Sequence, residues 1–70
     1  MQVIENAFVA GRSLGEKNLI IVENEILGVQ VTLENTKGIE VALGMEGRVI
    51  YNKATNQLVS FEPVMVEELV

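Results

Sequence analysis

Apolar and polar residues alternate along residues 28–43, and this alternation limits the possible folds more than any other feature of the sequence. A period of two is typical of a strand with one buried face. Facing residues of an antiparallel hairpin point to the same side of the sheet, so the apolar residues should face one another across a turn at residues 35–38. The predicted pairs are Leu33 with Ile39, Val31 with Val41 and Val29 with Leu43. In this hairpin Gly38 is free to adopt a positive φ.

A second hairpin is predicted from residues 48–52 and 58–62. The predicted pairs are Val49 with Phe61 and Tyr51 with Val59. This register leaves residues 54–56 as a three-residue loop. Asn56 then occupies the loop position that requires a left-handed conformation, which Asn tolerates better than most residues.

This second hairpin is predicted to be apolar on both faces. Ile50 and Leu58 fall on the side opposite the four paired residues, and a sheet with two apolar faces needs a cover on each. Pro63 lacks an amide hydrogen and should end the strand, and residues 64–70 are interpreted as an extended tail rather than a helical turn. Either this tail or another chain covers the second face. The residues expected at such an interface are Ile50, Leu58, Val64, Met65 and Val66.

The rest of the chain also favours strands. Residues 2–10 are rich in β-branched and aromatic side chains, which predicts a strand with Phe8 in the core. Two glycines, Ser and Asn within residues 11–18 predict a loop or wide turn. The apolar run 19–22 suits a buried strand at the centre of the sheet. No segment shows a helical stripe. We therefore predict one all-β domain over residues 1–70, a small barrel or sandwich of six to seven short antiparallel strands, mostly hairpins.

Missing residue types exclude most catalytic and metal chemistry. The chain has no Cys and no His, and all ten of its acidic residues are Glu. Disulfides, zinc sites and nucleophilic triads need the missing residues, and calcium loops rely on Asp. Glu23 and Glu25 would point the same way on an extended chain, but a solvated turn explains them better than a site for a cation or for acid–base catalysis. We therefore expect no enzyme activity, no cofactor and no metal.

The charge balance limits the classes of partner. Ten glutamates and five scattered basic residues give a formal net charge of −5, which repels phosphate backbones and anionic membranes. The aromatic residues are Phe8, Tyr51 and Phe61, and core packing accounts for them. Nucleic-acid binding by a small barrel is therefore the weakest alternative. The longest strongly apolar run, residues 19–22, is far shorter than the roughly 20 residues of a spanning helix, and the sequence lacks the basic start of a signal peptide. We expect no membrane association and a cytoplasmic location.

The small size of the chain suggests how it gains stability. A domain of 70 residues buries only about 60% of its unfolded surface, and a partner chain can supply the missing stability where disulfides and metals are absent. The first hypothesis is a non-enzymatic structural or interaction module that self-associates into a homo-oligomer through β edges or an apolar sheet face. The alternative, suggested by the net charge, is an acidic effector or inhibitor that docks on a basic surface of another protein.

Overall fold

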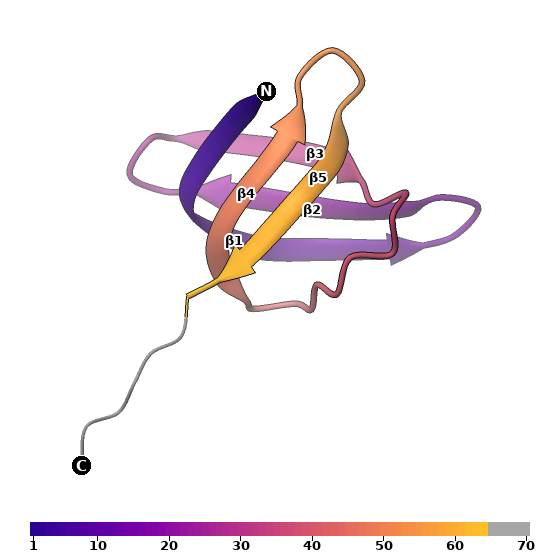
Figure 1. Ribbon diagram of the computed structural model, residues 1–70. Coiled ribbons are helices and arrows are strands. Elements are labelled where there is room, and N and C mark those ends of the chain that lie inside the picture. Colours follow the sequence, from indigo (N-terminus) through magenta and orange to yellow (C-terminus); the bar gives the residue numbers. More distant parts are fainter. Residues whose placement is uncertain (65–70) are drawn as a thin grey trace.

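The computed structural model describes residues 1–64, which form a closed barrel of five strands (Figure 1). The strands are β1 (Gln2–Leu14), β2 (Asn18–Asn24), β3 (Val29–Glu34), β4 (Glu46–Asn52) and β5 (Gln57–Pro63). Their order around the barrel is β1-β2-β3-β5-β4, and β4 pairs again with β1. The predicted all-β class and small barrel are confirmed. The predicted count of six to seven strands is too high, and one contact, between β3 and β5, is parallel.

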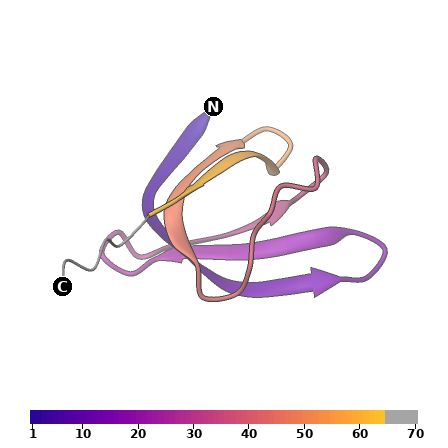
Figure 2. The same cartoon turned by 60° about the horizontal axis from the view of Figure 1, so that its bottom comes forward.

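β1 is long enough to belong to both halves of the barrel. Its first residues pair with β4 and its last residues pair with β2, and Figure 2 shows the strand curving from one set of partners to the other. The register shifts between Ile4 and Ala7 and again between Val9 and Gly11. Asn6, inside the first shift, has a φ of 52°. Irregularities of this kind bend a strand and let it change partners.

Two predictions about this strand are wrong. Phe8 is not in the core, because the register shift turns Ala7 and Val9 inward, both fully buried, and leaves Phe8 38% exposed. The loop predicted over residues 11–18 is mostly strand, since β1 continues to Leu14. Gly11 lies within β1, whereas Gly15 begins the short turn, residues 15–17, that separates β1 from β2.

β3 pairs with β2 rather than with residues 39–43. The two strands match over six residue pairs, joined by a short turn in which Gly28 has a φ of 65°. The hairpin predicted within residues 28–43 is therefore wrong, because residues 35–45 form a connection without a strand. Gly38 nevertheless has the predicted positive φ, 65°.

The connection keeps the predicted alternation of burial over residues 39–42 but not at Leu43, and it does not form the predicted strand. Val41 is buried and Ile39 packs against the core, while Leu43 is 63% exposed. Asn35 fixes the start of the connection. Its buried side chain donates to the Ile39 carbonyl oxygen over 2.7 Å and accepts the Ile39 N–H over 2.9 Å. These bonds hold the chain in a turn, so that Ile39 cannot continue as a strand beside β3.

β4 and β5 form the second hairpin close to its predicted limits. Val49 lies opposite Phe61, as predicted. The turn between the strands covers residues 53–56, and Asn56 has the predicted left-handed conformation, with a φ of 55°.

The predicted register fails toward the turn of this hairpin. The pairing shifts after Ile50, so that Tyr51 lies opposite Leu58 instead of Val59. A bulge adds one residue to one strand and thereby turns the following side chains to the other face. Leu58 consequently lies in the core and is 1% exposed. Its predicted place beside Ile50 on the outer face is wrong.

The interior is filled from all five strands and from the connection. The buried apolar residues are Ile4, Ala7, Val9, Ile20, Val22, Leu33, Val41, Val49, Tyr51, Leu58 and Phe61. β4 passes close to its neighbours at Gly47, which lies opposite Ala7 on one side and Pro63 on the other. A Cβ atom at Gly47 would contact the Glu62 carbonyl oxygen and come within 2.8 Å of the Pro63 Cα. Among residues 1–64, no helix has the length and hydrophobicity needed to cross a membrane.

Candidate functional site

The barrel closes between β3 and β5 through one residue pair. Glu34 lies opposite Gln57, and the Glu34 N–H donates to the Asn56 carbonyl oxygen over 2.8 Å. The other four junctions have five or six pairs each. In Figure 1 only the arrowhead of β3 lies beside the start of β5. Most of the outer edge of β3 therefore has no strand paired with it within residues 1–64.

The hydrogen bonds at the end of β3 show which backbone groups this open edge presents. Alternate residues of an antiparallel strand direct their N–H and C=O groups to the same neighbour. The Asn35 N–H donates to the Asn18 carbonyl oxygen on the β2 side, whereas Glu34 bonds on the opposite side. Gln30 and Thr32 therefore direct their N–H and C=O groups away from β2. These four groups have no hydrogen-bond partner within residues 1–64.

The core-facing side chains of β3 are also incompletely covered. Leu33, next to the residue pair that joins β3 to β5, is fully buried. Val29 and Val31 point to the same side and pack against the core, yet both stay half-buried. Unpaired backbone groups beside partly exposed apolar side chains form a template on which another strand can pair. We use the name β3 edge for residues 29–32, with the outward backbone groups of Gln30 and Thr32 and the half-buried side chains of Val29 and Val31.

Of the interface residues predicted from the sequence, the structure describes Ile50, Leu58 and Val64. Ile50 is half-buried on the outer side of β4, opposite Val3, which is 43% exposed. Val64, just beyond β5, is 52% exposed, while Leu58 is in the core. Met65 and Val66 lie outside the described residues. The structure thus places Ile50 beside an apolar neighbour that the sequence did not indicate, and it separates Ile50 from Leu58.

A second surface combines an exposed aromatic ring with carboxylates. Phe8 lies opposite Glu23 of β2 and Glu46 of β4. The remaining residues that line a hollow of about 360 Å³ together with Phe8 and Glu46 are Asn6, Asn24, Glu25 and Ile26. Arg48, nearby on β4, contacts Glu5 with 3.0 Å between its Nε and the carboxylate Oε1. We use the name acidic end of the barrel for Phe8 together with Glu23, Glu25 and Glu46.

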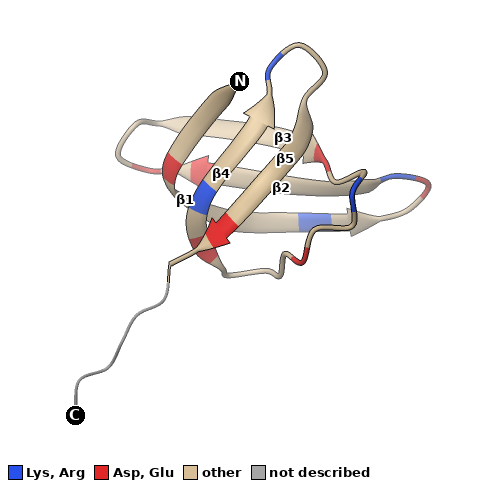
Figure 3. Cartoon of the chain, in the orientation of Figure 1, with Lys and Arg blue, Asp and Glu red and all other residues tan. Residues whose placement is uncertain are grey.

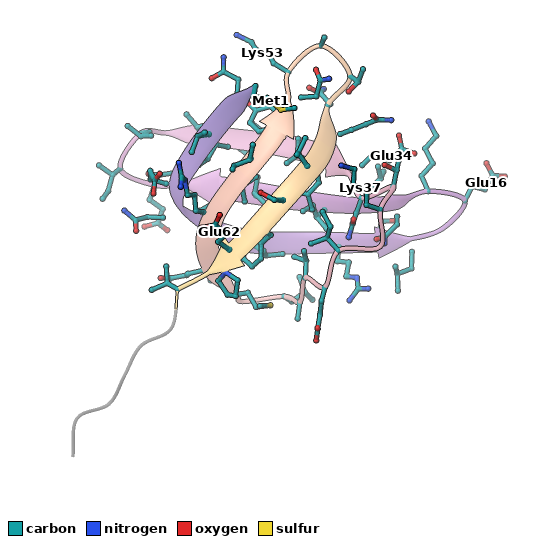
Figure 4. All side chains as sticks on the ribbon, in the orientation of Figure 1. Met1, Glu16, Glu34, Lys37, Lys53 and Glu62 are labelled. Atoms are coloured by element: carbon teal, nitrogen blue, oxygen red, sulfur yellow. The ribbon has the colours of Figure 1, made fainter. Side chains whose placement is uncertain are left out.

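The charges differ between the two ends of the β4–β5 hairpin. Arg48 on β4 lies opposite Glu62 of β5 and contacts Glu5 of β1, and Figure 3 shows acidic segments on the strands beside the basic segment of β4. Lys53, by contrast, lies at the turn of the hairpin, and Figure 4 shows it at the opposite end from Glu62. The Arg48–Glu5 pair is solvent-exposed and contributes little stability, because exposed ion pairs are well screened.

The outer surface of β2 and β3 bears on nucleic-acid binding. Five-stranded Greek-key barrels include the OB-fold, whose second and third strands bind oligonucleotides, although a fold alone does not define a function. The side chains on this surface are Leu19, Ile21 and Glu23 from β2, and Gln30, Thr32 and Glu34 from β3. Both charged side chains are acidic and none is aromatic, whereas single-strand binding uses basic grooves and stacking aromatics. This surface gives no support to the nucleic-acid alternative.

Comparisons of the chain with protein-family models, with curated proteins and with solved structures give no match. In the part of the chain that the structure describes, no group of three or more acidic, Cys or His side chains is placed to hold a metal ion.

Sequence reasoning missed the β3 edge because it assigned residues 39–43 as the partner of β3. The alternation correctly indicates that Val29 and Val31 face the core. It does not show which apolar segment pairs with them. The run at residues 19–22 was the available signal, since it is equally apolar and a short turn suffices to bring it beside β3.

Proposed function

We propose that this protein is a non-enzymatic interaction module that self-associates into a homo-oligomer through the β3 edge. The observation that carries the proposal is the set of four backbone groups on Gln30 and Thr32 that have no hydrogen-bond partner among the described residues, next to the half-buried Val29 and Val31. An added strand would bond these groups and cover both valines. The small core would gain the stability that a partner chain supplies.

The chemistry of the β3 edge supports a second copy of the chain as the partner. Two molecules of net charge −5 repel one another, so a self-association surface should avoid opposing carboxylates. The two exposed side chains on the edge, Gln30 and Thr32, are both uncharged. The acidic end, by contrast, would bring like charges together.

Charge pairs introduced on the β3 edge test the proposal. We expect wild-type mass to rise from the 7.7 kDa chain toward a multiple as concentration increases through the micromolar range, measured by light scattering. The double variant Gln30→Lys/Thr32→Lys should remain monomeric at every concentration, because like charges on paired strands repel. Gln30→Glu/Thr32→Lys should associate at least as well as wild type, because a glutamate of one copy can then face a lysine of the other.

The matched control is Ile50→Glu, which places a charge on the outer face of β4 and leaves the β3 edge intact. We expect it to associate like wild type. If Ile50→Glu dissociates the oligomer while both β3 variants do not, the sheet face around Ile50 is the interface and the β3 edge is not. Thermal unfolding of each variant shows that the barrel is retained.

The acidic end supports a second candidate function, an acidic effector that docks on a basic surface of another protein. The observation that favours it is the exposed Phe8 between Glu23 and Glu46, with the hollow beside it. An aromatic face attracts a cation, and carboxylates form charge-assisted bonds with arginine. A partner with exposed arginines on a convex surface would match this arrangement.

An arginine-rich peptide labelled with a fluorophore tests this candidate by anisotropy. We expect binding that weakens steeply between low salt and 0.5 M salt, because exposed charge pairs are screened. Glu23→Gln/Glu46→Gln should weaken binding at least about fivefold, corresponding to about 1 kcal/mol. Glu16→Gln/Glu40→Gln changes the net charge equally at exposed sites elsewhere and should have a smaller effect. Equal losses in the two variants would show that only net charge matters and would contradict docking at the acidic end.

A further inference from the structure

The structure assigns a register to the association proposed above. We infer that β3 pairs antiparallel with β3 of a second copy, around a two-fold axis that passes between the two Val31 residues. This inference rests on the proposed function and specifies its geometry. It makes the two sheets continuous across the interface, and the partner is a second copy of this chain.

The direction of the backbone groups restricts the possible registers. Hydrogen-bonded pairs across the interface must be formed by residues whose N–H and C=O groups point outward, and on this edge those residues have even numbers. A two-fold antiparallel pairing can then be centred on Gln30, on Val31 or on Thr32. Any register that pairs even with odd residues would leave the outward groups without partners.

Two of these three registers conflict with the structure of the monomer at one of the paired residues. Centring on Thr32 places Gln30 opposite Glu34, whose N–H already donates to Asn56. Centring on Gln30 places Thr32 opposite Gly28, which belongs to the β2–β3 turn and has a φ of 65°, far from extended backbone. Both registers would require the monomer to rearrange.

Centring on Val31 uses the four groups of Gln30 and Thr32 that lack a hydrogen-bond partner within residues 1–64, and no others. Gln30 of each copy faces Thr32 of the other, and the two residues exchange both N–H···O=C bonds. The two Val31 residues face each other as a non-hydrogen-bonded pair, in which side chains approach most closely. Each half-buried valine then covers the other. The outer surface of the new pairing carries only the uncharged side chains of Gln30 and Thr32.

Engineered cysteines provide a direct test, since the wild-type chain has none. In the inferred register the Cα atoms of the two residues 31 lie about 4.5 Å apart, within the range that a disulfide spans. Val31→Cys should therefore form a covalent dimer in a glutathione redox buffer, in which oxidised glutathione accepts the two electrons. We expect its rate at least tenfold above that of Thr32→Cys, whose two copies are offset by two residues and lie too far apart. Ala54→Cys, in the exposed β4–β5 turn, gives the rate of random collision.

A second variant guards against local damage from the substitution at half-buried Val31. In Gln30→Cys/Thr32→Cys both substituted positions are exposed. Position 30 of each copy faces position 32 of the other, so two disulfides should form per dimer. If wild type oligomerises but neither variant cross-links faster than Ala54→Cys, the register is wrong and the self-association proposal stands. If Thr32→Cys reacts fastest, the axis passes through residue 32 and the inference is overturned. If wild type is monomeric at all concentrations, the register and the proposed function both fail.

Discussion

Replacing Gly47 with alanine is expected to lower the free energy of unfolding by about 3 kcal/mol or more, because the added methyl group would overlap neighbouring backbone. Its Cβ would contact the Glu62 carbonyl oxygen and lie 2.8 Å from the Pro63 Cα. Neither atom is the end of a flexible side chain, so relief requires β4 and β5 to separate. A core of this size rarely supplies more than about 3–5 kcal/mol. Most Gly47→Ala molecules should therefore be unfolded, as measured by circular dichroism and urea titration.

The matched control for this change is Gly15→Ala. A Cβ at Gly15 meets nothing within 4 Å, and its φ is not in the left-handed region. We expect its unfolding midpoint to stay within about 0.5 kcal/mol of wild type. A wild-type midpoint for Gly47→Ala would show that β4 and β5 are not in contact there and would contradict the pairing of Gly47 with Pro63.

Truncating Leu58 to alanine is expected to cost about 2–5 kcal/mol, the range for deleting a buried leucine side chain. Leu58 is 1% exposed in the barrel core, and the cavity left behind would be lined by strands that cannot easily collapse. Ile50 lies opposite Ser60, next to the bulge in β5, and is half-buried on the outside of the barrel. Ile50→Ala should therefore lower the free energy of unfolding by about 1 kcal/mol or less. Urea titrations at a concentration where wild type is monomeric separate these costs from any effect on association.

The comparison between these two variants also tests the bulge. If the register had continued without a shift, Leu58 and Ile50 would share the outer face, and the two truncations would have similar, small effects on monomer stability. A small loss for Leu58→Ala would therefore contradict the inward position of Leu58. A large loss confined to Leu58→Ala supports it.

The sequence predicts the content of this fold better than its connections. The alternation of apolar residues correctly indicates that Leu33 and Val41 are buried, and the turn chemistry of Asn56 correctly locates the β4–β5 turn. Periodicity reports which side of a strand is apolar. It carries no information about which other apolar segment lies beside it, so β3 was assigned the wrong partner.

Single-residue irregularities account for the other errors. The shift at Asn6 turns Phe8 outward, and the extra residue at Val59 turns Leu58 inward. Each bulge changes the face of the neighbouring residues on one side of it, yet neither bulge is evident from composition or spacing. The β3 edge was missed for a related reason. The free edge of a strand is known only once its partner is known, and residues 19–22 were not recognised as the partner of β3.

The long, bent β1 has a consequence for the order in which the chain acquires its structure. The β2–β3 hairpin joins segments that are close in sequence, and closing so short a loop is fast. The first half of β1 must wait, because Ile4 pairs with Val49 of the fourth strand. Contacts between such distant residues slow folding. During synthesis the chain thus emerges with its first residues unpartnered, and an N-terminal segment that later joins both halves of the barrel stays available to other strands until β4 has left the ribosome.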